Sequence, residues 1–269
     1  MILRILSSFF LRDARQALSY RLSFLLDMAS VFFNAATFYF VAKLLEGSAN
    51  PVMKSHPGGY FPFVLIGIAF STYQSVGLNS FSQSLRQEQF LGTLESVLAT
   101  KIRVSTFLAG SALWDFAYAS FEVLIYFVVA WLAFGFSFEK MNGLSTLLSC
   151  LLTLTTFMGL GVLAAAFILR FKRGNPVTWI IASASELFGG VYFPQDVLPV
   201  WMKSIARWVP MTHALAALRE SLLSNAGVDE ISHHLVFLGI CTLVVWPVGV
   251  LTFKWALSRS QMDGSLGHY

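Results

Sequence analysis

The sequence predicts an all-α polytopic membrane protein with six membrane-spanning helices. Of its 269 residues, 56% are hydrophobic and only 12% are charged, whereas roughly a quarter of the residues in soluble domains are charged. Six apolar runs reach or approach the roughly 20 residues with which a helix crosses a bilayer. These predicted spans cover residues 22–45, 60–84, 104–136, 143–169, 176–193 and 235–258. The chain is therefore expected to be a single transmembrane domain, residues 1–269, with little sequence left for a soluble domain.

The basic residues predict that both termini are cytoplasmic, because short cytoplasmic loops are enriched in Lys and Arg. With the amino terminus inside, twelve of the 18 basic residues fall in cytoplasmic segments. These twelve are Arg4, Arg12, Arg15, Arg21, Arg86, Lys101, Arg103, Arg170, Lys172, Arg173, Lys254 and Arg259. The formal net charge of +4 is then explained by topology and by contact with anionic lipid headgroups. No nucleic-acid partner is expected.

Residues 1–20 are expected to form an amphipathic helix that lies in the membrane interface. One face carries Arg4, Ser8, Arg12, Arg15 and Ser19, and the opposite face carries Leu3, Leu6, Phe10, Ala14 and Ala17. A basic face suits the cytoplasmic leaflet. Two interpretations stay open, a simple anchor of the amino terminus and an anchor that also contacts a partner. These residues do not have the pattern of a removable signal peptide.

Residues 85–101 form a polar segment between the second and third apolar runs. The segment contains LRQEQFLGTLESVLAT, in which Arg86, Glu88 and Glu95 are charged. A short helical segment at this place would lie outside the hydrocarbon, between two connected spans. We expect it to be a cytoplasmic handle that another protein can push.

Polar and acidic side chains also occur inside the predicted spans. The second span carries Ser71, Ser75, Asn79 and Ser82 along one stripe, together with Gln74 and Gln83. The third span carries Ser111, Asp115, Tyr118 and Glu122 at spacings that place them on one helical face. Such groups must face protein or water. Both polar sets are compatible with helix packing and with lining a transport path, and the acids, with Asp27 and Glu186, could also be structural residues.

The stretch after Glu186 is apolar but is interrupted by helix breakers. Gly189, Gly190, Pro194, Pro199 and Pro210 punctuate an aromatic-rich sequence. A helix from Pro176 to Phe193 would be about 27 Å long, barely enough to cross the hydrocarbon core. We therefore expect the chain to turn near the outer leaflet, with residues 195–208 as a short helix set back into the membrane. Tyr192 and Phe193 would then lie near the exit of a path.

Several kinds of chemistry are not indicated. The sequence has no phosphate-binding loop of the G-x-x-x-x-G-K-[ST] type, and no H-E-x-x-H, G-x-S-x-G or C-x-x-C motif. We therefore expect no catalytic residue, no metal site and no cofactor bound by this chain. Adjacent His233 and His234 would point in different directions on a helix. Cys150 and Cys241 lie in separate apolar runs and are expected to be free thiols.

Two stretches resemble the permease subunits of type-2 ABC exporters, a family that exports drugs, lipids and polysaccharides. The first is RQEQFLGTLESVLAT, with its Gly-Thr-Leu-Glu core, and the second is GGVYFPQDVLPVWMKSIARWVPMTHALAALRE. The resemblance implies that residues 85–101 are a coupling helix that docks on a separate ATPase subunit. The residues it assigns to coupling are Arg86, Glu88, Gly92, Thr93 and Glu95. It also implies that residues 188–209 are an outer re-entrant gate, which contains Tyr192, Phe193, Pro194 and Trp201.

The leading hypothesis is a non-enzymatic permease subunit in a bacterial cytoplasmic (inner) membrane. The resemblance implies two ATP-binding-cassette ATPase subunits, which would hold ATP and magnesium, and a second permease, either a copy or a homologue. The expected substrate is amphipathic, such as a lipid, a lipid-linked glycan or a hydrophobic drug, and the path or gate would involve Asp115, Tyr118, Glu122, Tyr192, Phe193, Pro194 and Trp201. The alternative is a proton-coupled secondary transporter that uses Asp115, Glu122 and Glu186 as a relay. A membrane scaffold without transport is a third possibility.

Overall fold

The computed structural model describes residues 2–46, 58–90, 92, 104–137, 141–171 and 176–262. Every regular element within these residues is a helix. Five of the helices are long and apolar enough to cross a membrane. They are α2 (Arg21–Glu46), α4 (Tyr60–Phe90), α6 (Val104–Phe134), α7 (Gly143–Phe171) and α11 (Ser232–Met262). The all-α class is confirmed, and these five helices overlap five of the six predicted spans.

The predicted span over residues 176–193 is not confirmed, because its helix ends at Phe188. Helix α8 (Pro176–Phe188) has 13 residues and is therefore only about 20 Å long. It ends at Gly189-Gly190, where Gly190 has a φ of +75° that residues with a side chain rarely adopt. The hydrophobic run continues through this break, so its length in the sequence does not give the length of the helix.

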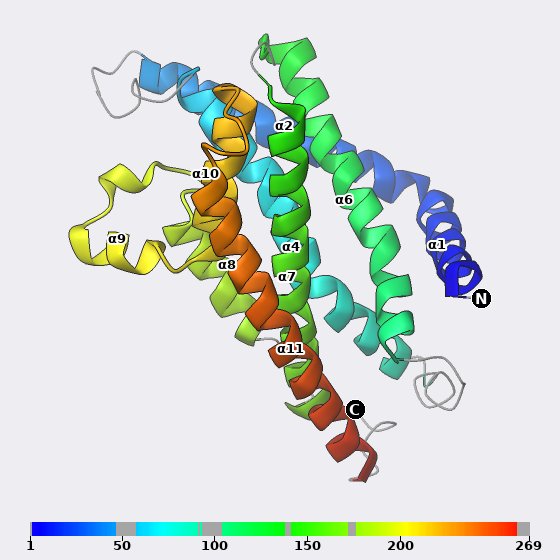
Figure 1. Ribbon diagram of the computed structural model, residues 1–269. Coiled ribbons are helices and arrows are strands. Elements are labelled where there is room, and N and C mark those ends of the chain that lie inside the picture. The colour runs from blue at the N-terminus through cyan, green and yellow to red at the C-terminus, as the bar shows by residue number, and fades with distance from the viewer. Residues whose placement is uncertain are drawn as a thin grey trace.

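After α8 the chain leaves the bundle and returns to it. The excursion contains the 3-10 turn η1 (Gln195–Val197) and helix α9 (Val200–Ala206), after which α10 (Pro210–Leu223) re-enters the bundle. The expected continuous helix over 195–208 is thus two short pieces separated by Pro199. The start of α10 lies beside the end of α8, because the side chain of Gln195 donates to both Phe188 O (3.1 Å) and Thr212 Oγ1 (3.0 Å). Figure 1 shows α9 projecting to one side of α8 and α10.

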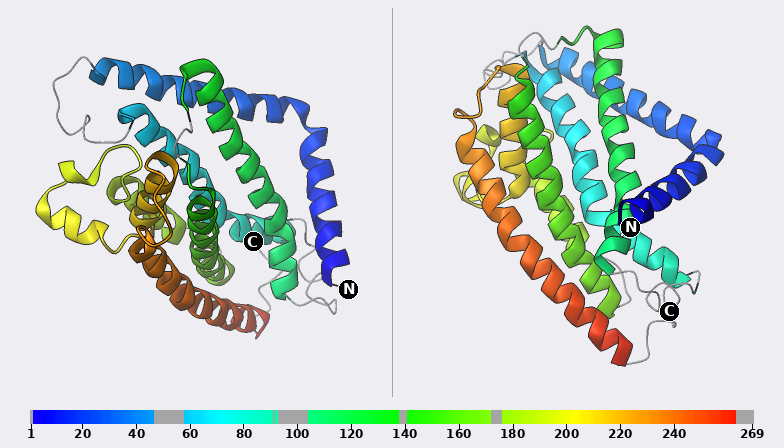
Figure 2. Two further views of the ribbon diagram at one scale, coloured as in Figure 1. Left: turned by 45° about the horizontal axis from the view of Figure 1, so that its top comes forward. Right: turned by 45° about the vertical axis from the view of Figure 1, so that its right-hand side comes forward.

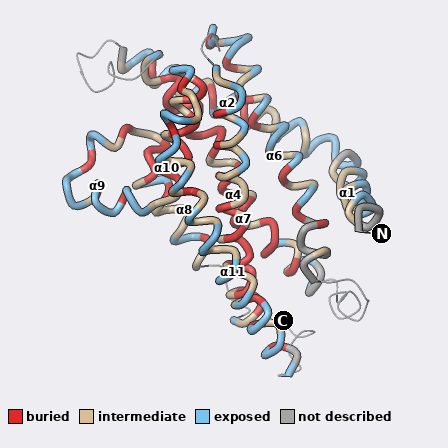
Figure 3. The backbone as a smooth tube through the Cα atoms, in the orientation of Figure 1, coloured by how far each residue is buried: buried red, intermediate tan, exposed pale blue. Residues whose placement is uncertain are grey.

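Helix α4 lies at the centre of the bundle. It packs on α6 on one side and on α7 on the other, and α11 runs along α7. The α4–α7 contact needs glycine at both Gly77 and Gly161, because a Cβ atom on Gly161 would overlap the backbone oxygen of Gly77 and a Cβ atom on Gly77 would lie 2.7 Å from Phe157 Cβ. Figure 3 shows that buried backbone concentrates on α4, α7 and α10, whereas α2, α9 and α11 carry many exposed residues.

Helix α1 (Ile2–Ser19) is joined to α2 by a sharp change of direction, visible in both views of Figure 2. Its range agrees with the amphipathic helix expected from the sequence. It packs on α6, with the ring of Phe10 edge-on to Trp114 at a centroid distance of 5.4 Å. The position of this helix in a membrane interface stays a prediction.

Candidate functional site

Two polar cavities lie along α4, and the first is formed near the amino-terminal helix. This amino-terminal cavity, about 420 Å³, is lined by residues of α1, α2, α4 and α6, among them Asp27, Asp115 and Tyr118. Ser80 Oγ donates a hydrogen bond to Asp115 Oδ2 at 2.5 Å. Tyr118 OH donates to Asp27 Oδ2 at 2.9 Å. Two of the three aspartates that line this cavity, Asp27 and Asp115, therefore have a hydroxyl donor, which offsets the cost of placing a carboxyl group between apolar helices.

The second cavity, about 410 Å³, lies between α2, α4, α6 and α8 and is called the central cavity here. The predicted stripe of α4 faces it, because Ser71, Ser75 and Asn79 are among its lining residues. Glu122 of α6 and Glu186 of α8 also line it, as does Tyr192 from the turn after α8. The fold thus brings together four helices, several of them distant in the sequence, around one polar space.

The predicted path residues divide between different places. Asp115 and Tyr118 line the amino-terminal cavity, whereas Glu122 and Tyr192 line the central cavity. The seven residues from Asp115 to Glu122 are about two helical turns, so the two acids share a face but lie at different depths. Trp201 on α9 is 64% exposed and lines neither cavity.

Tyr192 is held in place from two sides. Its ring stacks on Phe38 of α2 at 5.7 Å, and its carbonyl oxygen accepts a hydrogen bond from Tyr60 OH at 2.9 Å. Phe193, the next residue, is half-buried. These contacts place the turn after α8 against the first turns of α4 and the middle of α2. A shift of α2 or α4 would therefore displace Tyr192.

A third cavity, about 370 Å³, contains Pro194 and an arginine that sequence analysis did not select. The guanidinium of Arg219 on α10 donates to Phe63 O (3.2 and 2.9 Å) and to Gly190 O (2.8 Å). It also lies 3.5 Å over the ring of Phe63, close enough for a cation–π contact. Arg219 therefore fastens α10 to the start of α4 and to the turn that ends α8. The one available signal was a charge inside the apolar stretch after Pro210.

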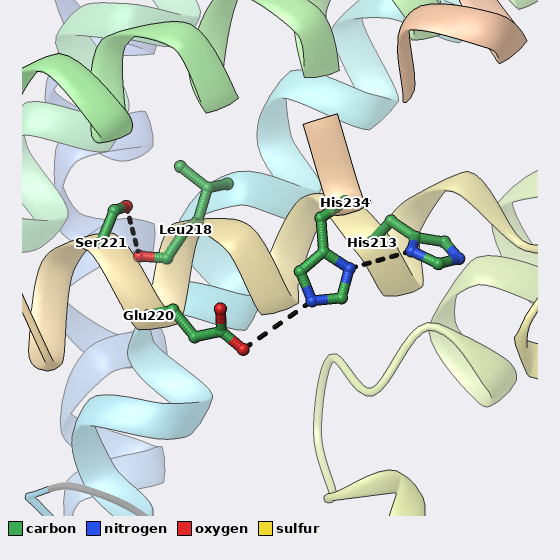
Figure 4. A network of polar contacts seen from close by, with 5 residues as sticks. All are labelled: His213, Leu218, Glu220, Ser221 and His234. Carbon is green, nitrogen blue, oxygen red and sulfur yellow. Dashed lines mark hydrogen bonds and ion pairs between the residues drawn. The ribbon is translucent and has the colours of Figure 1, made fainter. Parts of the chain in front are cut away.

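Helices α10 and α11 are joined by a polar chain that Figure 4 shows from close by. His213 Nε2 lies 3.0 Å from the carbonyl oxygen of Arg207, so this nitrogen carries a proton and donates it. In neutral His213 the Nδ1 atom then accepts from the Nδ1–H of His234, 2.9 Å away. On its other side His234 Nε2 is 3.7 Å from Glu220 Oε1. The partner of His234 is thus a histidine 21 positions away, and the described residues contain no group of three His, Cys, Asp or Glu side chains that could hold a metal ion.

The coupling residues can be placed only in part. Helix α4 continues to Phe90, so residues 85–90 are its last turns and do not start a separate helix. Arg86 is half-buried there, and its Nε atom has no hydrogen-bond partner within the described residues. Glu88 lies on the same final turns, and Gly92 has a φ of +69°. Thr93 and Glu95 lie outside the described residues.

Five apolar helices long enough to cross a membrane, with polar cavities between them, define a polytopic membrane protein. A family model described as ABC-2 type transporter matches residues 3–223, and the chain belongs to that family. The chain is 28% identical over 144 residues to the linearmycin resistance permease protein LnrN of Bacillus subtilis (strain 168). That alignment covers 50% of this chain and 36% of LnrN. The chain is also 24% identical over 219 residues to nodulation protein J of Rhizobium leguminosarum bv. trifolii, which covers 80% of each.

These comparisons confirm the resemblance drawn from the GTLE and aromatic-proline segments. The chain is an ABC-2 permease, the transmembrane component of an ABC transporter. ABC-2 permeases work with ABC ATPase partners.

Proposed function

We propose that this chain forms half of the translocation path of an ATP-driven exporter of amphipathic molecules. A second permease, a copy or a homologue, would supply the other half. Two ATPase subunits, which hold ATP and magnesium, would dock on residues 85–101 of the two permeases. The basic-residue pattern supports a bacterial inner-membrane location with both termini in the cytoplasm.

The observation that supports this proposal best is that α4 both lines the central cavity and leads into the segment assigned to coupling. One uninterrupted helix lines the central cavity with Ser71, Ser75 and Asn79 and ends in the segment assigned to coupling. From Asn79 to Phe90 the helix axis rises only about 16 Å. Because α4 is well packed on both sides, a push on its end would be transmitted to the cavity as a rigid-body displacement.

The first test is a charge reversal in the coupling segment. We expect Glu95→Arg to lower ATP hydrolysis by the reconstituted complex at least about tenfold, because a reversed charge at a docking surface opposes association. Glu230→Arg, in the exposed loop between α10 and α11, is the matched control and should keep parental turnover. Normal turnover and normal subunit association in Glu95→Arg would contradict the docking role.

A proton-coupled secondary transporter is the second candidate. The observation in its favour is that Glu122 and Glu186 line one cavity. Against it, Asp115 lines the other cavity and already accepts a hydrogen bond from Ser80, so the three acids do not form one relay. Transport driven by an imposed pH gradient without ATP, and lost in Glu122→Gln, would favour this candidate. Transport that requires ATP and ignores a protonophore would favour the exporter.

A further inference from the structure

The acids of the central cavity differ from those of the amino-terminal cavity in lacking donors. Asp27 and Asp115 are each bonded to a hydroxyl group. Glu122 and Glu186 accept no hydrogen bond and form no ion pair with any residue that the structure describes. Among the described residues that line the central cavity there is also no Lys, Arg or His. The cavity therefore presents two carboxyl groups without a positive charge to neutralise them.

A buried amide in the same cavity also lacks a partner. Gln74 is only 3% exposed, and its Nε2 atom has no hydrogen-bond acceptor among the described residues. Gln74 lines the central cavity together with the two carboxyl groups. Leaving such a group unpaired costs about 1–3 kcal/mol. An oxygen acceptor brought by a ligand would remove that cost.

Two aromatic side chains are also part of the lining. Tyr126 from α6 and Tyr192 from the turn after α8 border the cavity, and Phe38 fixes the ring of Tyr192 by stacking. The faces of tyrosine rings attract cations, most strongly where water is excluded. Carboxyl groups together with aromatic rings suit an organic ammonium group. An anionic headgroup would instead be repelled by both glutamates, and a bound proton would leave the Gln74 amide unpaired.

We propose that the central cavity binds the ammonium group of an amphipathic substrate that carries a hydroxyl or carbonyl oxygen beside its nitrogen. The inference rests on the proposed transport function and names the substrate class. Glu122 and Glu186 hold the ammonium group. The amide of Gln74 donates to the neighbouring oxygen, and the apolar chain leaves the cavity along the surface between the helices.

The test uses a matched pair of probes and the complex with its ATPase subunits in dodecyl maltoside, without nucleotide. Tritiated sphinganine has an ammonium group next to hydroxyl groups, and N-acetylsphinganine keeps the chain and the hydroxyls but has no charge. We expect the parent complex to bind sphinganine at least about tenfold more tightly than the acetylated probe, the size of one lost charge-assisted hydrogen bond. Because this comparison needs no mutation, it is independent of any folding defect in a variant.

The variants locate the site. Glu122→Gln and Glu186→Gln should each weaken sphinganine binding about tenfold and leave binding of the acetylated probe unchanged. Gln74→Leu should weaken both probes, since both carry the acceptor oxygen. Asp229→Asn, an exposed acid in the loop between α10 and α11, is the control and should bind as the parent does.

Equal affinity for the two probes, or parental sphinganine binding in both glutamate variants, would overturn the proposal. A second assay, ATP-dependent export by the same complex, tests the proposed exporter function separately from the ammonium site. ATP-dependent export together with equal binding of the two probes would support the exporter function and rule out the ammonium site. Charge-selective binding in a complex whose transport ignores ATP would keep the site and remove the exporter.

Discussion

Helices α2 and α4 are both apolar enough to cross a membrane, and their hydropathies are almost equal, yet their surroundings differ completely. In the most apolar stretch of α4, 78% of the residues are buried, against 11% in α2. Helix α4 is enclosed by α6, α7 and the turn after α8. Helix α2 presents Leu25, Phe33 and Phe40 outward. Hydropathy therefore identifies a membrane crossing but does not say whether protein, lipid or a second chain will cover it.

The largest expected effect comes from breaking the contact that buries α4. We expect Gly161→Leu to lower the melting temperature of the purified protein by about 10 °C or more, because the new side chain meets the backbone of Gly77. Gly239→Leu on α11 is the matched control, since nothing lies within 4 Å of a Cβ atom there. Similar melting temperatures for the two variants would show that the α4–α7 contact is looser than described.

A smaller loss is expected where Arg219 fastens α10 to α4. Arg219→Leu leaves Phe63 O and Gly190 O without their donor, which should cost about 2–4 kcal/mol of unfolding free energy. Arg219→Lys, which cannot reach two carbonyl groups with the same planar geometry, should fall between the parent and the leucine variant. Exposed Arg207→Leu serves as the control. A leucine variant at position 219 that unfolds like the parent would refute the fastening role.

The smallest effect on stability is expected on the outward face of α2. Phe33→Ala and Phe40→Ala should change the unfolding free energy of the isolated chain by less than about 0.5 kcal/mol, because both rings are exposed. Val31→Ala, at a fully buried position of the same helix, should cost more than about 1 kcal/mol.

Native mass spectrometry of the same variants would tell what covers α2. Dimers lost only in the phenylalanine variants would place a second permease on this face, and unchanged dimers would leave it to lipid.

Much of the fold could be predicted because long apolar runs translate directly into helices. The predicted range 143–169 and the observed α7 differ by two residues at one end. Predictions failed where the hydrophobicity of the sequence and the ends of the helices did not coincide. The apolar signal persists beyond Gly190 although the helix stops there, and the helix of α4 persists to Phe90 although the sequence turns polar.

The site was predicted less completely than the fold. The spacing of residues along the sequence shows which of them share a helical face, but it does not show which residues on other helices they contact. The spacing of Asp115 and Glu122 correctly placed them on one side of α6, but only the fold separates them into two cavities. The link between His213 and His234 joins residues 21 positions apart on different helices. Arg219 reaches Phe63 across 156 positions. No periodicity in a single sequence carries such information.

The side chain of Gln195 touches both the last turn of α8 and the first turn of α10. Residues 189–209 therefore leave and rejoin the bundle at nearly one point, as in an Ω-loop whose base is closed. Lengthening a loop whose ends are held together adds little closure entropy. The tip of the excursion around α9 can thus accept inserted residues, an epitope or a fluorescent label while α8 and α10 keep their alignment, which makes it a natural attachment point for following the transporter in a living cell.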